Sequence, residues 1–217
     1  MIIFFSETDL FPIHLFLLPI FAAKYKNMKE FIGKLGLKLG RWKVVNEAPS
    51  DLGNAVCIVA PHTAIEDFFV GLAFYWAYDI KFKVMIKKEF FVPVLGWLLK
   101  KVGGIPVNRG HQNHLVEQMV DMFSQNKDTH LVICPEGTRK AVKHWKKGFY
   151  VIAKGAHVPI VLGFIDYKKR YCGIERIFYP TGDYEKDLAE IWDYYKDIKA
   201  KHPEGFNLDE QYRNKQA

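Results

Sequence analysis

Apolar residues along this chain follow two patterns that alternate from one end to the other. Continuous apolar runs predict buried strands, and the clearest of them occupy residues 55–60, 130–134 and 158–165. Two shorter strands are expected at residues 83–86 and 104–107. Apolar residues at helical spacing predict helices near residues 31–39, 65–78, 114–123 and 183–201. Because strands alternate with helices, the sequence predicts an α/β fold with a mixed, largely parallel sheet flanked by helices.

A separate apolar stretch lies near the N-terminus, at residues 10–23. It spans 14 residues and is interrupted by Pro12 and Pro19, whereas a membrane-crossing helix needs about 20 apolar residues. Acidic residues precede the stretch and lysines follow it, which is the reverse of a secretory signal. We therefore expect residues 1–40 to form a helical segment in the bilayer interface, with its lysines near anionic head groups. A buried core helix with solvated lysines is the alternative.

The net charge and the cysteines indicate which partners and which redox compartment to expect. The chain has 217 residues, which suits one α/β domain, and its formal net charge of +7 suits an anionic partner such as a membrane surface. Its aromatic residues form no platform interleaved with basic residues, so nucleic-acid binding is not expected. The three cysteines are far apart and form no CxxC motif. We expect no disulfide framework, no metal site and a reducing cytosol.

The first candidate for chemistry is a histidine and aspartate pair. His62 follows a predicted buried strand, and Asp67 lies five positions later. In one continuous helix the two side chains would point apart, so they meet only if His62 lies in a turn before the helix that holds Asp67. Thr63, a common type of helix cap, favours that turn. A neutral imidazole there can take a proton from a hydroxyl while the carboxylate stabilises the imidazolium. The alternative is a capping Thr63 beside a surface histidine.

Three further motifs lie next to predicted strands. Residues 135–139 (PEGTR) offer backbone amides, a hydroxyl and an arginine that can bind an anion at a turn. Arg109 ends the segment at residues 103–109, where a guanidinium suits a phosphate. Residues 158–161 alone indicate only a core strand. Each turn alone also fits an ordinary solvated loop, but open α/β sheets bind ligands at strand ends, and the ordered set indicates one site.

Taken in this order, the four motifs resemble those of the glycerol-3-phosphate and lysophosphatidate acyltransferase family. The matching segments are His62-Thr63-Ala64-Ile65-Glu66-Asp67, Gly104-Ile105-Pro106-Val107-Asn108-Arg109, Pro135-Glu136-Gly137-Thr138-Arg139 and Val158-Pro159-Ile160-Val161. The match covers roughly residues 50–165, and the chain looks like a short bacterial branch of the family. Residues 41–217 would then form the acyltransferase domain, after the membrane-associating segment at residues 1–40.

The resemblance implies a role for each matched residue. His62 would be the general base on the acceptor hydroxyl, and Asp67 would be its partner. The acceptor's phosphate and polar head would be held by a larger set, which comprises Arg109, Glu136, Gly137, Thr138 and Arg139. Pro159 would shape the floor of the site. The donor would be an acyl thioester on coenzyme A or acyl carrier protein, with no metal or other cofactor, at the cytoplasmic face of the cell membrane as a peripheral or monotopic protein.

Several positions depart from the family pattern, and they bear on the acceptor. Asn108 stands where the family usually has Asp, Glu66 where it often has Trp, and Leu162 where it usually has Pro. The leading hypothesis is O-acylation of a lysophospholipid, most simply lysophosphatidate to phosphatidate. Backbone amides near Glu136 and Gly137 are the expected oxyanion donors. The alternatives are acylation of a lyso-amino-acid lipid (lyso-ornithine or lyso-glycine lipid) and a catalytically silent lipid-binding membrane protein.

Two further surfaces combine apolar or aromatic residues with lysines. The apolar patch at residues 90–99 has lysines on both sides, which suits an acyl-tunnel mouth or a membrane contact, and equally a core helix with solvated ends. Three lysines surround Trp145, namely Lys143, Lys146 and Lys147. They would meet anionic lipid or the donor's phosphates, or form a solvated basic loop.

Overall fold

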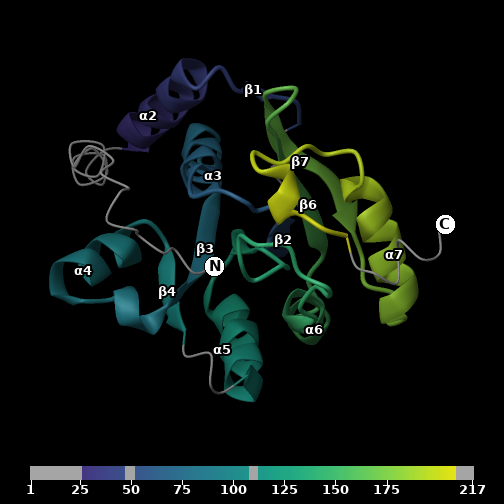
Figure 1. Cartoon of the computed structure of the whole chain (residues 1–217). Helices are drawn as coiled ribbons and strands as arrows, with labels where there is room; N and C mark the ends of the chain where they lie inside the picture. The colour runs from purple at the N-terminus through teal and green to yellow at the C-terminus, as the bar shows by residue number, and fades with distance from the viewer. Residues whose placement is uncertain (1–25, 47–51, 108–111, 209–217) are drawn as a thin grey trace.

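The computed structural model describes residues 26–46, 52–107 and 112–208 (Figure 1). Its strands form one seven-stranded sheet within these residues, in the order β1-β7-β6-β2-β5-β3-β4. They are β1 (Lys43–Val44), β2 (Ala55–Val59), β3 (Lys81–Lys87), β4 (Gly104–Val107), β5 (Thr129–Ile133), β6 (Ile160–Asp166) and β7 (Tyr171–Phe178). Neighbouring strands are parallel except β6 and β7, which are antiparallel. The carboxyl ends of the central strands β2, β5 and β6 therefore meet at one edge.

Helices cover both faces of the sheet. They are α2 (Lys26–Leu39), α3 (Glu66–Ala77), α4 (Pro93–Lys101), α5 (Gln112–Gln125), α6 (Gly148–Gly155) and α7 (Tyr184–Tyr195), with short 3-10 turns η1 (Lys88–Phe90) and η2 (Pro203–Gly205). α5, α6 and α7 pack on one face, and α2 and α3 pack on the other. Figure 1 shows the sheet between these two groups. The result is a three-layer α/β/α arrangement, which confirms the predicted fold class.

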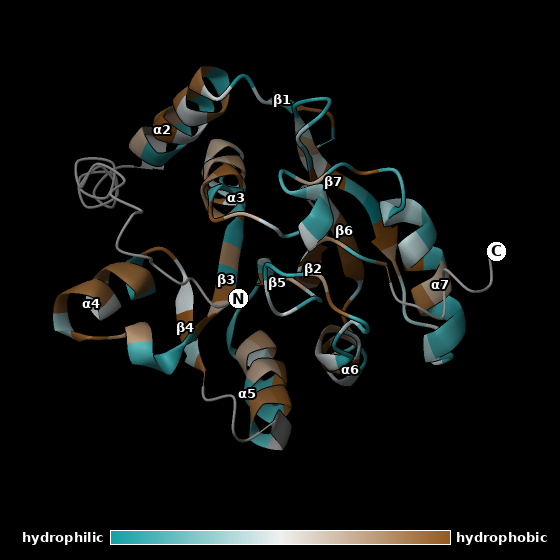
Figure 2. Ribbon diagram, viewed as in Figure 1, coloured by the Kyte–Doolittle hydropathy of each residue, from teal (hydrophilic) through white to brown (hydrophobic). Residues whose placement is uncertain are grey.

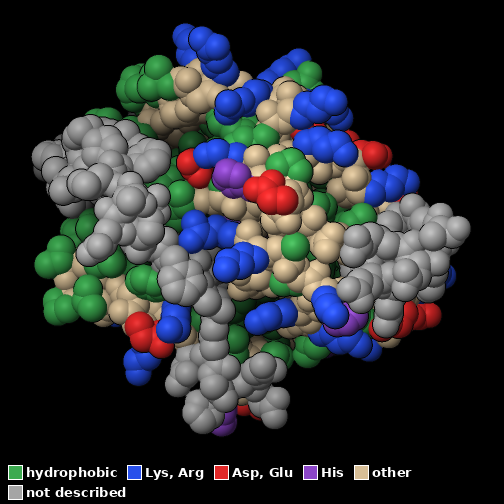
Figure 3. All heavy atoms as spheres, viewed as in Figure 1, with side chains coloured by type: hydrophobic (Ala, Val, Ile, Leu, Met, Phe, Trp, Pro, Cys, Tyr) green, Lys and Arg blue, Asp and Glu red, His purple; other side chains and the backbone are tan. Residues whose placement is uncertain are grey.

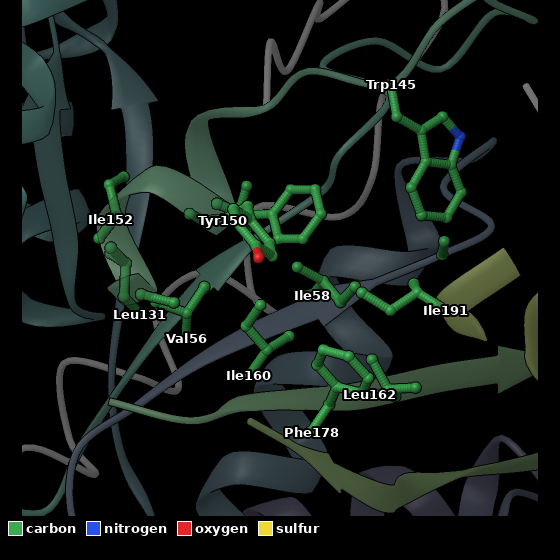
Figure 4. Close-up of a cluster of buried hydrophobic side chains, with 14 of the residues drawn as sticks. Val56, Ile58, Leu131, Trp145, Tyr150, Ile152, Ile160, Leu162, Phe178 and Ile191 are labelled. Atoms are coloured by element: carbon green, nitrogen blue, oxygen red, sulfur yellow. The ribbon is translucent and has the colours of Figure 1, made fainter. Parts of the chain in front are cut away.

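The central strand β2 shows why its sequence is an unbroken apolar run. Val56 and Ile58 pack with α5, α6 and α7, as Figure 4 shows for the larger cluster. Ala55 and Cys57 point to the opposite face and pack with residues of α3. A strand between two helical layers has no solvent face, so both of its sides are apolar. In Figure 2 the central strands accordingly carry much of the brown, hydrophobic colour.

The predicted strands and helices are confirmed, with boundary shifts of a few residues at most positions. The largest shift is in α7, which ends at Tyr195, whereas the pattern predicts a helix up to residue 201. β1, α6, β7 and the two 3-10 turns were not predicted, and α4 was expected only as one alternative for the apolar patch at residues 90–99. β7 escapes a search for apolar runs because Glu175 and Arg176 stand exposed in its middle. The predicted interfacial stretch at residues 10–23 lies outside the described residues.

Candidate active site

The turn between β2 and α3 brings His62 and Asp67 together. β2 ends at Val59 and α3 begins at Glu66, so His62 lies in the connection and Asp67 in the first helical turn. The Nδ1 atom of His62 lies 3.0 Å from Oδ2 of Asp67, and both side chains are buried. This confirms the geometry that the five-residue spacing requires.

The N-cap position of α3 is Ile65, where no side chain forms a cap, and the carboxylate of Asp67 instead holds the connection before the helix. Oδ2 of Asp67 accepts from the backbone amides of Thr63 and Ala64, each at 3.0 Å. The Thr63 hydroxyl instead accepts from the amide of His202, so the prediction of a threonine cap is wrong. A carboxylate near a helix N-terminus is favoured by both the free amides and the helix dipole. The same carboxylate thus fixes the connection between β2 and α3 and orients the histidine.

The tautomer of His62 follows from its partner. An ionised carboxylate only accepts hydrogen bonds, so Nδ1 of His62 donates to it, and in a neutral imidazole the lone pair is then on Nε2. Nε2 is buried, has no hydrogen-bond partner among the described residues, and belongs to a side chain that lines a cavity. His62 is only 3% exposed, which excludes the alternative of a surface histidine. A buried basic nitrogen that faces a cavity is what a general base requires.

Glu136, in the turn after β5, binds the main chain of His62 through its carboxyl group. Its Oε1 accepts from the backbone amide of His62 at 3.0 Å, and its Oε2 is buried without a partner among the described residues. Burial raises the pKa of the Glu136 carboxyl from 4.5 to about 8, and the negative charge of Asp67 contributes. Glu136 therefore holds a proton at neutral pH and fixes the main chain of His62.

Gly137 and Lys146 form the polar rim of the same cavity. Gly137 has a φ of +67°, and a Cβ added there would lie 2.9 Å from Cε of Lys146. Lys146 thus lies against the backbone of this turn, and both residues line the cavity. The structure shows no ion-pair partner for Lys146 within the part of the chain that it describes. The Gly137 amide donates to the carbonyl of Cys134 at 3.0 Å, so it is engaged in the turn and is not free for an oxyanion.

The remaining residues implied by the resemblance are not brought into the cavity. Thr138 and Arg139 continue the turn outside the residues that line it, and the Thr138 hydroxyl accepts from the amide of Lys140 at 3.4 Å. Pro159 precedes β6 at the amino end of the strands, and its carbonyl accepts from the amide of Val56. That edge of the sheet is opposite the one that holds His62. Arg109 lies outside the described residues.

The cavity has a volume of about 580 Å³ and is largely apolar. Pockets for small ligands typically have roughly 300–1,000 Å³. Its walls come from α3, β3, β5, α5 and α6, and the apolar side chains include Phe68, Leu72, Phe82, Val84, Leu115, Val116, Val151 and Ile152. His62 and Lys146 thus both line a space whose apolar walls suit a hydrocarbon chain.

The described residues offer no group of three or more His, Cys, Asp or Glu side chains that could hold a metal ion. His130, which is buried beside β2, hydrogen-bonds the hydroxyl of Tyr75 at 3.3 Å. Burial lowers the pKa of His130 from 6.5 to about 4, so this imidazole stays neutral. His62 is the histidine that the structure places in the cavity wall.

The buried His62–Asp67 pair thus lies at the carboxyl edge of an α/β sheet, in the wall of an apolar cavity. The Acyltransferase family model matches residues 41–162, more than half of the chain, and the chain belongs to that family. The match supports the glycerolipid acyltransferases predicted from the four motifs. No curated protein matches the chain.

The sequence analysis did not single out two residues that the structure places at the site, Lys146 and Tyr167. Lys146 was one of three lysines around Trp145. Lys146 and Lys147 both line the cavity, and Lys147 is paired with Glu185 at 3.7 Å, so only the fold distinguishes Lys146. Tyr167 follows β6 and its hydroxyl donates to Oδ1 of Asp67 at 2.6 Å. It lies 100 residues from Asp67 in sequence and belongs to none of the motifs. In the sequence, the only feature that could have indicated Tyr167 is its position directly after the predicted strand that became β6, which pairs with β2.

Proposed function

We propose that this acyltransferase moves a fatty acyl group from an acyl thioester, carried by coenzyme A or acyl carrier protein, to the hydroxyl of a lysophospholipid. The most direct case is lysophosphatidate to phosphatidate, in a short bacterial branch of the family. The observation that carries the proposal is the unpartnered Nε2 of His62, buried in the wall of an apolar cavity while Asp67 holds Nδ1.

The proposed reaction needs no covalent enzyme intermediate. Nε2 of His62 takes the proton of the acceptor hydroxyl as its oxygen bonds to the thioester carbon. Asp67 stabilises the imidazolium that forms. When the carbon–sulfur bond breaks, the imidazolium returns the proton to the leaving thiolate. The ester product and the free thiol then account for all atoms.

The two parts of the lipid substrates suit the two parts of the site. The apolar walls fit the acyl chain, whose burial is favourable at about 25 cal/mol per Å² of apolar surface. Lys146 offers a cation at the rim, where a phosphate of the acceptor or the donor would bind. Thr138 and Arg139, which the resemblance implies for the same role, are not among the residues that line the cavity.

The proposed setting is the cytoplasmic face of a membrane that contains anionic lipid. On α2, Phe31 is 60% exposed and Leu39 is 75% exposed, and with Leu35 they form one stripe at four-residue spacing beside Lys34 and Lys38. Figure 3 shows hydrophobic side chains, in green, over α2 and over α4. On α4 the exposed apolar residues are Val94 and Trp97. No helix of the described ranges has the length and apolar content needed to cross a bilayer.

An acceptor panel tests the function directly. Purified full-length protein is incubated with acyl-CoA or acyl carrier protein and with lysophosphatidate, other lysophospholipids or lyso-amino-acid lipids, and products are read by mass spectrometry. We expect phosphatidate from lysophosphatidate, and loss of product in His62→Ala. Full activity of His62→Ala would contradict the mechanism. Product from lyso-amino-acid lipids alone would contradict the acceptor, and binding to vesicles without turnover on any acceptor would contradict catalysis.

A further inference from the structure

The turn between β6 and β7 brings a third side chain to the catalytic pair. Tyr167 directly follows β6, and β6 lies beside β2, whose carboxyl end leads to His62. The Tyr167 hydroxyl donates to Oδ1 of Asp67 at 2.6 Å. Oδ2 of the same carboxylate is already occupied by Nδ1 of His62 and by two backbone amides. Each oxygen therefore has its own donors, and the plane of the carboxylate is fixed from both sides.

Tyr167 is itself held in place. Its backbone amide donates to the carbonyl of Lys199 at 2.9 Å. Its ring packs edge-to-face against Trp42, with the two centroids 5.0 Å apart. The guanidinium of Arg170 lies 5.1 Å from the Trp42 ring centre and 5.9 Å from that of Tyr167. The hydroxyl thus reaches Asp67 from a rigid position.

The hydroxyl keeps its proton throughout the pH range of the reaction. Burial, and then the negative charge of Asp67, raises the pKa of Tyr167 well above its usual range. A protonated phenol donates to an ionised carboxylate in a short, charge-assisted hydrogen bond. Tyr167 therefore acts as a fixed donor and takes no part in proton transfer.

We propose that Tyr167 is a positioning residue of the acyl transfer, which holds Asp67 so that Nε2 of His62 faces the cavity; this rests on the function proposed above. Without the hydroxyl, Oδ1 of Asp67 loses its donor and the carboxylate gains freedom to rotate about its last bond. The hydrogen bond from His62 to Oδ2 then loses its fixed direction. Misplacement of a catalytic group by about 1 Å can cost about 100-fold in rate.

Other charged and titratable groups surround the pair and stay in place when only this hydroxyl is removed. They are Glu66 of α3, Cys134 and Glu136 after β5, Lys146 at the cavity rim, Arg170 beside Tyr167, and Lys201 and His202 of the C-terminal segment. Of these, Lys201 is paired with Glu66 at 2.5 Å. A change of the pH profile in a hydroxyl-deletion variant therefore reports the loss of that one donor.

The test is Tyr167→Phe, with Tyr194→Phe as its matched control. Tyr194 on α7 also donates to a carboxylate, Oε2 of Glu175 at 3.1 Å, but away from the cavity. In Tyr167→Phe we expect kcat to fall about 10- to 100-fold with little change in KM, because the base is misaligned. The acid limb of the rate profile should move to higher pH, since Asp67 with one donor fewer attracts the imidazolium proton more strongly. Tyr194→Phe should change neither.

A second measurement is independent of turnover. The Nδ1 proton of His62 is observed by NMR in the full-length protein without substrate, after assignment by its loss in His62→Ala. We expect its resonance to shift in Tyr167→Phe and to stay in place in Tyr194→Phe. An unshifted resonance overturns the proposal, as does wild-type kcat with an unchanged acid limb, or an equal loss of rate in both variants. If the wild-type protein transfers no acyl group, the proposed function fails, and the resonance still decides whether Tyr167 positions the pair.

Discussion

The turns after β2 and β5 follow adjacent parallel strands and open on the same cavity, yet they use their polar residues in different ways. After β2, His62 and Asp67 form a pair within five residues, and the contact needs only a turn and the start of a helix. After β5, the polar residues of the PEGTR motif point to different surroundings. Glu136 turns inward to the amide of His62, whereas Thr138 and Arg139 lie away from the cavity lining.

The difference shows what a motif specifies. The first turn specifies a local geometry, so its spacing is enough to predict the contact. The second specifies a backbone conformation, in which Gly137 adopts a positive φ and lets Lys146 lie against the main chain. The charge at the cavity rim then comes from the following loop, and only the fold decides which lysine supplies it. The next four variants test this contrast.

The largest effect is expected from Asp67→Asn in the first turn. The asparagine oxygen would stay at the Oδ2 position, where the backbone amides of Thr63 and Ala64 donate, but it carries no negative charge to stabilise the imidazolium of His62. We expect kcat to fall about 10³- to 10⁴-fold, measured with lysophosphatidate and a saturating acyl donor. Asp193→Asn, an exposed aspartate on α7, is the control and should keep full activity. A loss below about 10-fold in Asp67→Asn would show that the local pair is not the centre of the chemistry.

Lys146→Met should have the next largest effect. It keeps the length of the side chain and removes the cation at the cavity rim. We expect kcat/KM for a phosphate-bearing acceptor to fall about 10- to 100-fold, as for loss of a hydrogen bond to a charged group. Lys154→Met, at an exposed lysine on α6, is the matched control. Equal kcat/KM values for Lys146→Met and Lys154→Met would contradict a role for Lys146 and would indicate that the PEGTR turn itself binds the phosphate.

Glu136→Gln separates the two roles open to the second turn. If Glu136 is a neutral support of the His62 amide, glutamine keeps that contact and activity stays within about threefold, a difference under 1 kcal/mol. If a carboxylate there must bind the acceptor, activity falls much further. Steady-state rates below pH 7 distinguish the two outcomes, with Glu136→Ala as the variant that removes the acceptor of the His62 amide.

Glu136→Gln should also change how the stability of the protein depends on pH. The folded pKa of Glu136, about 8, lies above its usual 4.5, so the folded state binds more protons than the unfolded state between these values. This contribution is fully present below pH 4.5 and is lost as the pH rises through about 8. As the pH rises from 4.5 to about 8, the Tm of Glu136→Gln should therefore rise relative to the Tm of the wild type. Each kcal/mol of difference corresponds to about 2–4 °C in a chain of this size. A constant difference between the two proteins would contradict a neutral, buried Glu136.

The smallest effect on overall rate is expected from Gly71→Leu, which tests the cavity that both turns share. Gly71 lies on α3 in the cavity wall, and a Cβ there would meet no heavy atom within 4 Å. The Cβ of a leucine there has open space and its side chain occupies part of the cavity, so long acyl donors should lose rate while short donors keep it. A chain-length series of acyl-CoA donors measures the shift. Gly36→Leu on α2, away from this wall, is the control, and an unchanged profile in Gly71→Leu would place the acyl chain elsewhere.

Most of the fold was predictable because buried strands and amphipathic helices leave strong local patterns. The exceptions have physical causes. β7 carries exposed charges between its apolar residues. α6 has only 8 residues, and its apolar residues 149–153 form one continuous run that shows no helical spacing. α7 stops at Tyr195, although Ile198 continues the apolar spacing and packs against the core. Burial continued after the helix ended, so periodicity alone placed the boundary too far along the chain.

By itself, the sequence predicted the α/β class from the alternation of local apolar patterns, the His62–Asp67 contact from its spacing within one turn, and the acyltransferase family from four ordered motifs. Tertiary structure alone decided that Glu136 faces His62, that Lys146 borders the cavity, and that Tyr167 reaches Asp67. It also placed Pro159 at the far edge of the sheet. These positions depend on strand order and on how β2, β5 and β6 lie side by side. The order of strands is a property of packing between distant segments, which the local pattern of apolar and polar residues does not encode.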